Sequence, residues 1–168
     1  DGGSTDGTME RIKELQSANQ IVNSEPDEGM YDALNKGIKL ADGDIVGLVH
    51  SDYFFSDELV ISDVVSAFSD ANVQLVYGDL DYVEESNTNK VVRHWVAGPF
   101  KAQKLRMGWM PPHPTVFVRK SLFDQLGGYD TSFKISADYD AMLRFFPIGN
   151  LLCLCPSRTC PNASGWDE

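Results

Sequence analysis

The sequence predicts an α/β domain with a mostly parallel central sheet flanked by helices. Helical and strand patterns alternate from residue 6 to residue 79, as they do in doubly wound α/β proteins. The stretch IVGLVH at 45–50 is a nearly continuous apolar run, which is typical of a strand buried on both faces of a parallel sheet. From residue 80 the pattern changes to two strands around a polar turn, which predicts a small antiparallel hairpin portion.

The first half of the chain is expected to alternate between helices and strands. Residues 6–19 and 30–41 place apolar side chains on one face of a helix. Ser56 is suited to cap a third helix that runs to about residue 69. The strands predicted between and after these helices are 21–23, 45–50 and 73–79.

The second half is expected to combine the hairpin with further helices and one strand. Residues 80–96 predict two strands with their turn at Asn87–Asn89. HPTVFVRK at 113–120 predicts another strand. A short helix ended by Gly127 and a helix capped by Ser136 complete the predicted elements.

One domain is predicted over residues 1–150, and an irregular tail over residues 151–168, because the tail shows no periodicity. Cys153, Cys155 and Cys160 all lie in this tail. Their spacing does not match a zinc site, and no histidine near them supplies a fourth ligand. We therefore predict no structural metal in the tail.

Composition and charge limit the classes of partner. The chain has 168 residues and a formal net charge of −11, which argues against binding of nucleic acid through a basic patch. A bound phosphate would need local help from a cation, a lysine or a helix N-terminus, because the overall field repels it. No apolar run approaches the roughly 18 residues of a membrane span, so we expect no membrane span and a cytoplasmic location.

The first eight residues, DGGSTDGT, predict a tight loop that leads into a helix. In wound sheets, ligands bind where strands end and loops enter helices. Because no strand stands before this loop, the chain is predicted to be a fragment that lacks an upstream strand–helix–strand unit. An EF-hand calcium loop is excluded, since Gly3 and Thr5 stand where that loop requires Asp or Asn. The alternative is an ordinary turn with a helix cap.

Three further segments carry candidate chemistry, and each has a structural alternative. Asp52 in HSDYFF follows the predicted buried strand, where a carboxylate can meet a ligand or a metal, or can flank the next helix. Asp138 and Asp140 in SADYDAMLR stand in the first turn of a helix, where a carboxylate serves as a general base or interacts with the helix dipole. His113 lies among prolines in WMPPHPTVF, held there for ligand binding or as a surface-loop histidine.

Taken together and in order, four stretches resemble the family 2 glycosyltransferases of bacterial cell-surface polysaccharide synthesis. The resemblance is to the colanic-acid and capsule type enzymes with the GT-A fold, and it covers residue 1 to about residue 146. It implies an inverting transferase, in which an acceptor hydroxyl attacks the anomeric carbon of a nucleotide-sugar and displaces the nucleoside diphosphate. The stretches are DGGSTDGT, DEGMYDALNKGIKLADGDIVGLVHSDYFF, HPTVFVRKSLFDQLGGYD and SADYDAMLR.

The resemblance implies roles for individual residues. Asp1 matches an aspartate that binds the nucleobase, and DALNKG matches a helix start near the nucleotide. Asp52 falls on the acidic metal-binding motif and Asp138 on the general base, while His113 matches a histidine near the donor phosphates or the acceptor. The implied site residues are Asp138 as catalytic residue; Asp1, Asp32, Asn35, Lys36 and Asp52 for the donor nucleotide; Asp52 and His113 for the metal; and His113 and Asp140 on the acceptor side.

The implied cofactor is a divalent cation, Mg²⁺ or Mn²⁺, which would neutralise the charge that develops on the leaving diphosphate. Tyr53 stands where the family usually has the second aspartate of the acidic motif, and a neutral phenol is a poor ligand for a hard cation. Metal binding is therefore expected to rest on Asp52, with His113, and to be weakened. Ala137 replaces the usual glutamate before Asp138.

The resemblance implies two kinds of partner. They are a UDP- or GDP-sugar donor and a saccharide or lipid-linked saccharide acceptor, the latter at the inner face of the cytoplasmic membrane. A degenerate homologue that binds nucleotide or glycan without turnover is the first alternative, and Tyr53 motivates it. A nucleotidyltransferase is the second, but it would require basic residues in its Gly-rich N-terminal loop, and DGGSTDGT contains no Lys or Arg.

Overall fold

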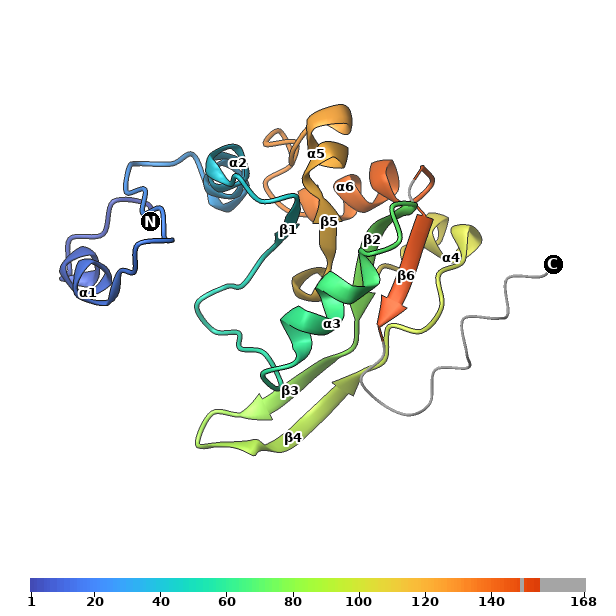
Figure 1. Ribbon diagram of the computed structural model, residues 1–168, viewed down its shortest axis with the longest axis horizontal. Coiled ribbons are helices and arrows are strands. Elements are labelled where there is room, and N and C mark those ends of the chain that lie inside the picture. Colours follow the sequence, from blue (N-terminus) through green and yellow to red (C-terminus); the bar gives the residue numbers. More distant parts are fainter. Residues whose placement is uncertain (149, 155–168) are drawn as a thin grey trace.

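A computed structural model describes residues 1–148 and 150–154, and it contains a four-stranded sheet and a separate two-stranded hairpin (Figure 1). No helix within these residues is long and apolar enough to cross a membrane. The elements in chain order are α1 (Thr8–Leu15), α2 (Met30–Leu40), β1 (Ile45–Gly47), α3 (Val60–Ala67), β2 (Val73–Gly78), β3 (Leu80–Glu84), β4 (Asn87–Trp95), α4 (Ala102–Arg106), the 3₁₀ turn η1 (His113–Thr115), β5 (Phe117–Arg119), α5 (Lys120–Leu126), α6 (Ala137–Phe145) and β6 (Asn150–Leu154).

The strand order of the main sheet is β1-β5-β2-β6. β5 pairs antiparallel with β1 and with β2, whereas β2 and β6 are parallel. β1, β2 and β6 therefore run in one direction and β5 runs against them. The predicted α/β class is confirmed, but the sheet is mixed, since only the β2–β6 pairing is parallel. β5 is inverted because the chain, after the hairpin and α4, re-enters the sheet at the end where β2 leaves it (Figure 1).

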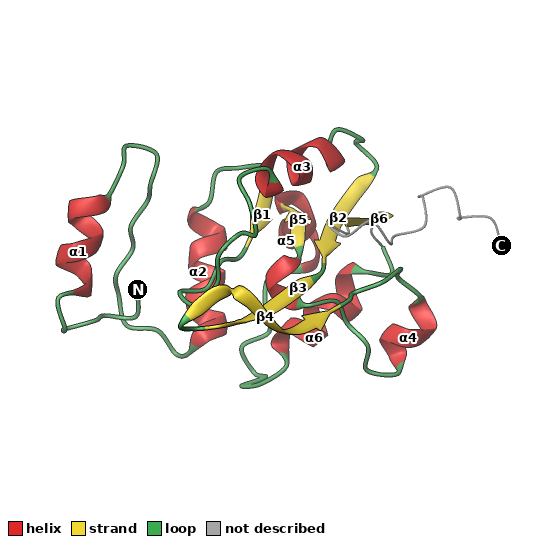
Figure 2. Cartoon of the chain, turned by 90° about the horizontal axis from the view of Figure 1, so that it is seen from below, coloured by secondary structure: helices red, strands yellow, loops and turns green. Residues whose placement is uncertain are grey.

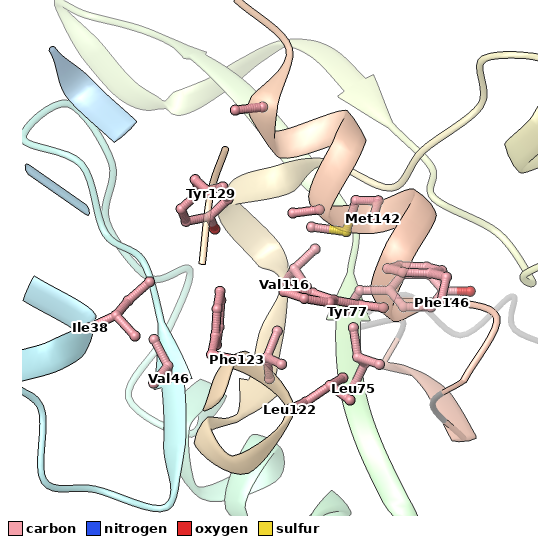
Figure 3. Close-up of a cluster of buried hydrophobic side chains, with 14 of the residues drawn as sticks. Ile38, Val46, Leu75, Tyr77, Val116, Leu122, Phe123, Tyr129, Met142 and Phe146 are labelled. Carbon is pink, nitrogen blue, oxygen red and sulfur yellow. The ribbon is translucent and has the colours of Figure 1, made fainter. Parts of the chain in front are cut away.

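The core forms on both faces of β2, the most buried strand among the described residues. Leu75 and Tyr77 pack with residues of α5 and α6 in the larger apolar cluster (Figure 3). Val76 points to the other face, where it packs with Val64 and Phe68 at α3. Figure 2 shows the same arrangement, with α3 on one side of the sheet and α5 and α6 on the other. The rigid core thus supports the strand ends from which the loops of the site emerge.

The N-terminal segment lies apart from this core. Both views place α1 beyond α2, away from the sheet (Figures 1 and 2), and α1 buries no residue. The prediction of a strand at 21–23 is wrong, because these residues pair with no other strand in the described chain. A strand needs a neighbour to satisfy its backbone groups. Here the Asn23 carbonyl instead accepts a hydrogen bond from the N-terminal amine of Asp1 at 3.0 Å.

Two predicted boundaries differ from the structure. The hairpin turns at residues 85–86, since Glu84 pairs with Asn87, so the predicted turn at Asn87–Asn89 is wrong. Register is set by side-chain pairs along the strands and not only by residues that favour turns. Ser56 does not cap α3, which begins at Val60. The Asp57 carboxylate accepts the amide of Leu59 at 2.8 Å, and this local turn delays the start of the helix.

The C-terminal boundary also differs from the prediction. Residues 150–154 form β6, which pairs with β2, so the irregular tail predicted from residue 151 begins with part of a strand. Cys155 and Cys160 lie outside the described residues.

Substitution of two glycines tests the close packing of β1 against β5. A β-carbon at Gly47, the last residue of β1, would overlap the Phe117 ring of β5, whereas one at Gly37 in α2 would meet nothing within 4 Å. We expect Gly47→Ala to lower the free energy of unfolding by about 1–3 kcal/mol through overpacking. Gly37→Ala, the control, should raise it by about 0.5–1 kcal/mol. Urea unfolding measures both, and a Gly47→Ala variant as stable as the original would contradict the β1–β5 packing.

Candidate functional site

The candidate site is a cleft of about 520 Å³ at the ends of several elements, a volume within the usual range of ligand pockets. Segments far apart in the sequence form it: the start of α2, the loop after β1, the hairpin, the turn η1 and the start of α6. Its lining residues are Met30, His50, Ser51, Asp52, Tyr53, Leu80, Tyr82, Trp95, Met110, His113, Pro114 and Asp138. Asp52, His113 and Asp138, all predicted from the sequence, therefore lie in one cleft.

The loop after β1 presents Asp52 to the cleft. The Tyr53 amide donates to the His50 carbonyl at 3.0 Å, and the two rings meet edge to face with centroids 5.4 Å apart. Asp52, which is exposed, lies within this turn. Burial raises the pKa of the Tyr53 phenol, and the nearby Asp52 carboxylate raises it further. Tyr53 is therefore a neutral neighbour of Asp52.

Asp138 stands in the first turn of α6, after Ser136 in a left-handed conformation (φ 74°). One carboxylate oxygen, Oδ1, accepts the Tyr31 hydroxyl at 3.1 Å and the Tyr139 amide at 2.9 Å. Within the described residues, no hydrogen bond reaches the other oxygen, Oδ2. The Ser136 side chain makes no cap hydrogen bond, although Ser136 is the predicted N-cap residue. The result is an oriented carboxylate with one oxygen available to a ligand.

His113 lies beneath the cleft and is 9% exposed. Its Nε2 lies 2.9 Å from the Tyr129 hydroxyl, so this nitrogen is already engaged. Burial lowers the pKa of His113, the Asp138 carboxylate opposes that shift, and His50 adds to it. Burial likewise raises the pKa of Tyr129 well above its usual value. His113 is therefore neutral near pH 7 and supplies no positive charge to the cleft.

Asn35 supports the cleft without lining it. Its side-chain amide donates to the Tyr129 carbonyl at 2.8 Å, and its side-chain oxygen accepts the Tyr129 amide at 2.8 Å. The approach is close, since a β-carbon at Gly128 would overlap the Asn35 side chain. The predicted nucleotide-binding residue Asn35 thus fixes the loop that carries Tyr129, the partner of His113.

The remaining predicted residues lie outside the cleft. Asp1 and Lys36 line a second cavity of about 530 Å³, between the N-terminal segment and α2. The Asp1 carboxylate accepts hydrogen bonds from Gly3, Ser4 and Ser24. Of the three aspartates to which the resemblance assigns roles, Asp52 and Asp138 line one cleft, whereas Asp1 lines the other cavity.

Asp32 and Asp140 line neither cavity, and each pairs with a cation on its own helix. Asp32 lies 3.0 Å from the Lys36 ammonium. Asp140 lies 2.9 Å from the Arg144 guanidinium, which also donates to three backbone carbonyls at 126–128. These contacts stabilise α2 and the loop after α5.

The potential metal-ligating side chains of the cleft determine how a divalent cation could bind. No group of three or more His, Cys, Asp or Glu side chains that could hold a metal occurs in the described part of the chain. Mg²⁺ is commonly bound through one or two carboxylates together with substrate phosphates, without an all-protein cage. Asp52 in an open cleft fits that mode, whereas the neutral, partly engaged ring of His113 and the phenol of Tyr53 add little.

Sequence reasoning missed Tyr31 and Tyr129. The ring centroids of these two residues lie 5.6 Å apart, and their hydroxyls reach Asp138 and His113 respectively. Tyr31 directly precedes the stretch DALNKG, in which the resemblance implies only charged and amide side chains as nucleotide ligands. Its spacing of four residues from Asn35 places both on one helical face.

The histidines provide a pH test of this geometry. The Asp81 carboxylate raises the pKa of exposed His94 above 6.5, whereas burial lowers that of His113 below 6.5. Because the pKa of His113 is lowered by folding, this residue destabilises the folded state as the pH falls below 6.5. Because the pKa of His94 is raised by folding, that residue stabilises the folded state at low pH, and this contribution is lost as the pH rises above 6.5. As the pH is lowered, histidine NMR titration should show His94 protonating before His113. The reverse order would contradict the buried His113–Tyr129 contact, and His94→Gln assigns the signals.

Residues 1–134 match the family described as glycosyl transferase family 2. An uncharacterized glycosyltransferase of Mycobacterium tuberculosis is 34% identical over 148 residues, which are 86% of this chain and 54% of that protein. A PGL/p-HBAD biosynthesis glycosyltransferase of Mycobacterium bovis is 33% identical over 155 residues, covering 87% of this chain and 56% of that protein. The chain thus spans about half the length of the curated relatives it matches.

Solved structures show the same fold. A mannosyltransferase of Pyrobaculum calidifontis, in complex with GDP-Man and Mn²⁺, superposes with a TM-score of 0.66 at 16% identity, over 93% of this chain and 44% of that one. TarS of S. aureus superposes with a TM-score of 0.67 at 18% identity, over 94% and 48%. The fold is therefore GT-A, and the chain belongs to glycosyl transferase family 2.

Proposed function

We propose that the protein transfers a sugar from a nucleotide-diphosphate-sugar to an acceptor hydroxyl, with inversion at the anomeric carbon. The observation that carries the proposal is the pair of carboxylates in one cleft, Asp52 after β1 and Asp138 at the start of α6. Asp138 has one oriented and one available oxygen. Family membership supports sugar transfer as the reaction class.

Asp138 is the proposed general base. A sugar hydroxyl is a weak nucleophile, so its proton must be removed as it attacks. In a single displacement, the acceptor oxygen forms a bond to the anomeric carbon while the bond to the diphosphate breaks, and the nucleoside diphosphate leaves with the electron pair. The proton passes to Asp138 Oδ2, while Tyr31 and the Tyr139 amide hold Oδ1.

Asp52 is the proposed protein ligand of a divalent cation, together with the donor's phosphates. Such a cation, when bound, would offset the negative charge of the diphosphate. The mannosyltransferase neighbour is described in complex with GDP-Man and Mn²⁺, which supports Mn²⁺ and a UDP- or GDP-sugar for this chain. The chain itself offers no lysine or arginine among the described residues that line the cleft. Its neutral Tyr53 leaves the carboxylate of Asp52 to act alone.

The proposed acceptor is a saccharide or lipid-linked saccharide of colanic-acid or capsule type, reached at the cytoplasmic face of the membrane. The motif resemblance supports this assignment. A non-catalytic nucleotide- or glycan-binding homologue is the second candidate, and Tyr53 in place of an acidic ligand favours it.

Replacement of the base distinguishes these candidates. In the full-length protein with Mn²⁺, we expect Asp138→Asn to lower the rate of sugar transfer by roughly 10²–10⁴-fold, because the amide cannot accept the proton. Calorimetry should show unchanged binding of UDP or GDP. Asp124→Asn removes an exposed carboxylate on α5 that pairs with Lys120, and it serves as the control with ordinary transfer. Transfer at the original rate in Asp138→Asn would exclude Asp138 as the base.

A further inference from the structure

The β3–β4 hairpin forms one wall of the cleft. Tyr82 pairs with Arg93, and Leu80 pairs with Trp95, in the antiparallel register of the two strands. Directly paired residues share one face of a hairpin, and Leu80, Tyr82 and Trp95 of this face line the cleft. We refer to Tyr82, Arg93 and Trp95 as the hairpin platform. Figure 1 shows the hairpin extending away from the main sheet beyond β2.

Arg93 is held by stacking. Its guanidinium carbon lies 5.2 Å from the centroid of the Tyr82 ring and 5.9 Å from that of Trp95. Both are cation–π contacts, and they restrict the side chain before any ligand arrives. A pre-oriented guanidinium loses less conformational entropy when it binds a ligand.

The charge of Arg93 is not used within the described part of the chain. Lys90 on the same strand pairs with Glu84 at 2.9 Å, and His94 pairs with Asp81. Arg93 is exposed and makes no hydrogen bond or ion pair with any described residue. What distinguishes Arg93 is its contact with two aromatic rings beside the cleft.

The location of Arg93 indicates what it could bind. The carboxylates of Asp52 and Asp138 belong to the cleft itself, so an anionic ligand is disfavoured beside them. Arg93 stacks on the two aromatic rings of the hairpin wall and provides a positive group on that side. Arginine recognises carboxylate and phosphate oxygens through its planar fork of N–H donors. Tyr82 and Trp95 offer apolar surface to the C–H groups of a sugar ring.

We propose that the hairpin platform is a subsite for the acceptor saccharide, and that it selects an acceptor whose anionic oxygen group binds Arg93. The anionic group is a carboxylate or a phosphate. This inference rests on the proposed function, because it assumes that an acceptor sugar enters the cleft. It assigns the acceptor a chemical class: an acidic sugar or a phosphate-linked saccharide.

Saturation-transfer NMR on the full-length protein tests the subsite without nucleotide or metal. The probes are methyl β-glucuronide, glucose 1-phosphate and neutral methyl β-glucoside. At least one anionic probe should bind roughly three- to tenfold more tightly than the glucoside. Arg93→Gln should remove this difference and Arg93→Lys should retain part of it. Lys90→Gln, which deletes a positive charge from the same strand, should leave the difference unchanged. The anionic probe that binds more tightly identifies the carboxylate or the phosphate as the recognised group.

Three results would overturn the subsite: equal binding of all probes by the original protein, retention of the preference in Arg93→Gln, or an equal loss in Lys90→Gln. Weakened UDP or GDP binding in Arg93→Gln, with sugar binding unchanged, would assign Arg93 to the donor and would also overturn it. The proposed function fails separately, if the protein binds no nucleotide with Mn²⁺ or if Asp138→Asn still transfers sugar.

Discussion

The paired hydrogen bonds between the Asn35 side chain and the Tyr129 backbone connect α2 to the loop beside His113. Both are partly buried and join residues 94 positions apart, and losing them would leave an amide and a carbonyl without partners, at a cost of about 1–3 kcal/mol. Tyr129 then reaches His113. From the preceding turn of α2, Tyr31 reaches Asp138. Tyr31 and Asn35, on one face of α2, therefore orient residues of the cleft although neither of them lines it.

The negative charge of the cleft explains why a diphosphate ligand would need an accompanying cation. Its lining includes the carboxylates of Asp52 and Asp138 together with the neutral side chains of His113 and Tyr53, on a chain of net charge −11. A diphosphate would be repelled by such a field unless a divalent cation accompanied it. The proposed mechanism therefore assigns charge neutralisation to a divalent cation and proton removal to Asp138. Arg93 stands apart as a cation fixed by aromatic rings and not by a carboxylate.

The sequence predicted what depends on local pattern and on motif order. Helix periodicity located α2, the terminal signals at Gly127 and Ser136 located α5 and α6, and the family motifs included Asp52, His113 and Asp138, which line one cleft. It could not predict effects of pairing partners distant in the chain: the inverted β5, the turn at 85–86 and the unpaired residues 21–23. Asn35 and Asp140 were predicted to contact ligands, because a motif does not distinguish a side chain that binds a ligand from one that holds the loop beside it.

Crystallographic location of bound manganese tests the central claim most directly. Crystals of the full-length protein with Mn²⁺ and GDP or UDP, measured at the manganese absorption edge, would give one anomalous peak for the ion. The account predicts this peak beside the Asp52 carboxylate, in the cleft that also contains Asp138. A peak in the second cavity, beside Asp1 and Asp27, would contradict it and would separate the donor phosphates from the residue assigned to remove the proton.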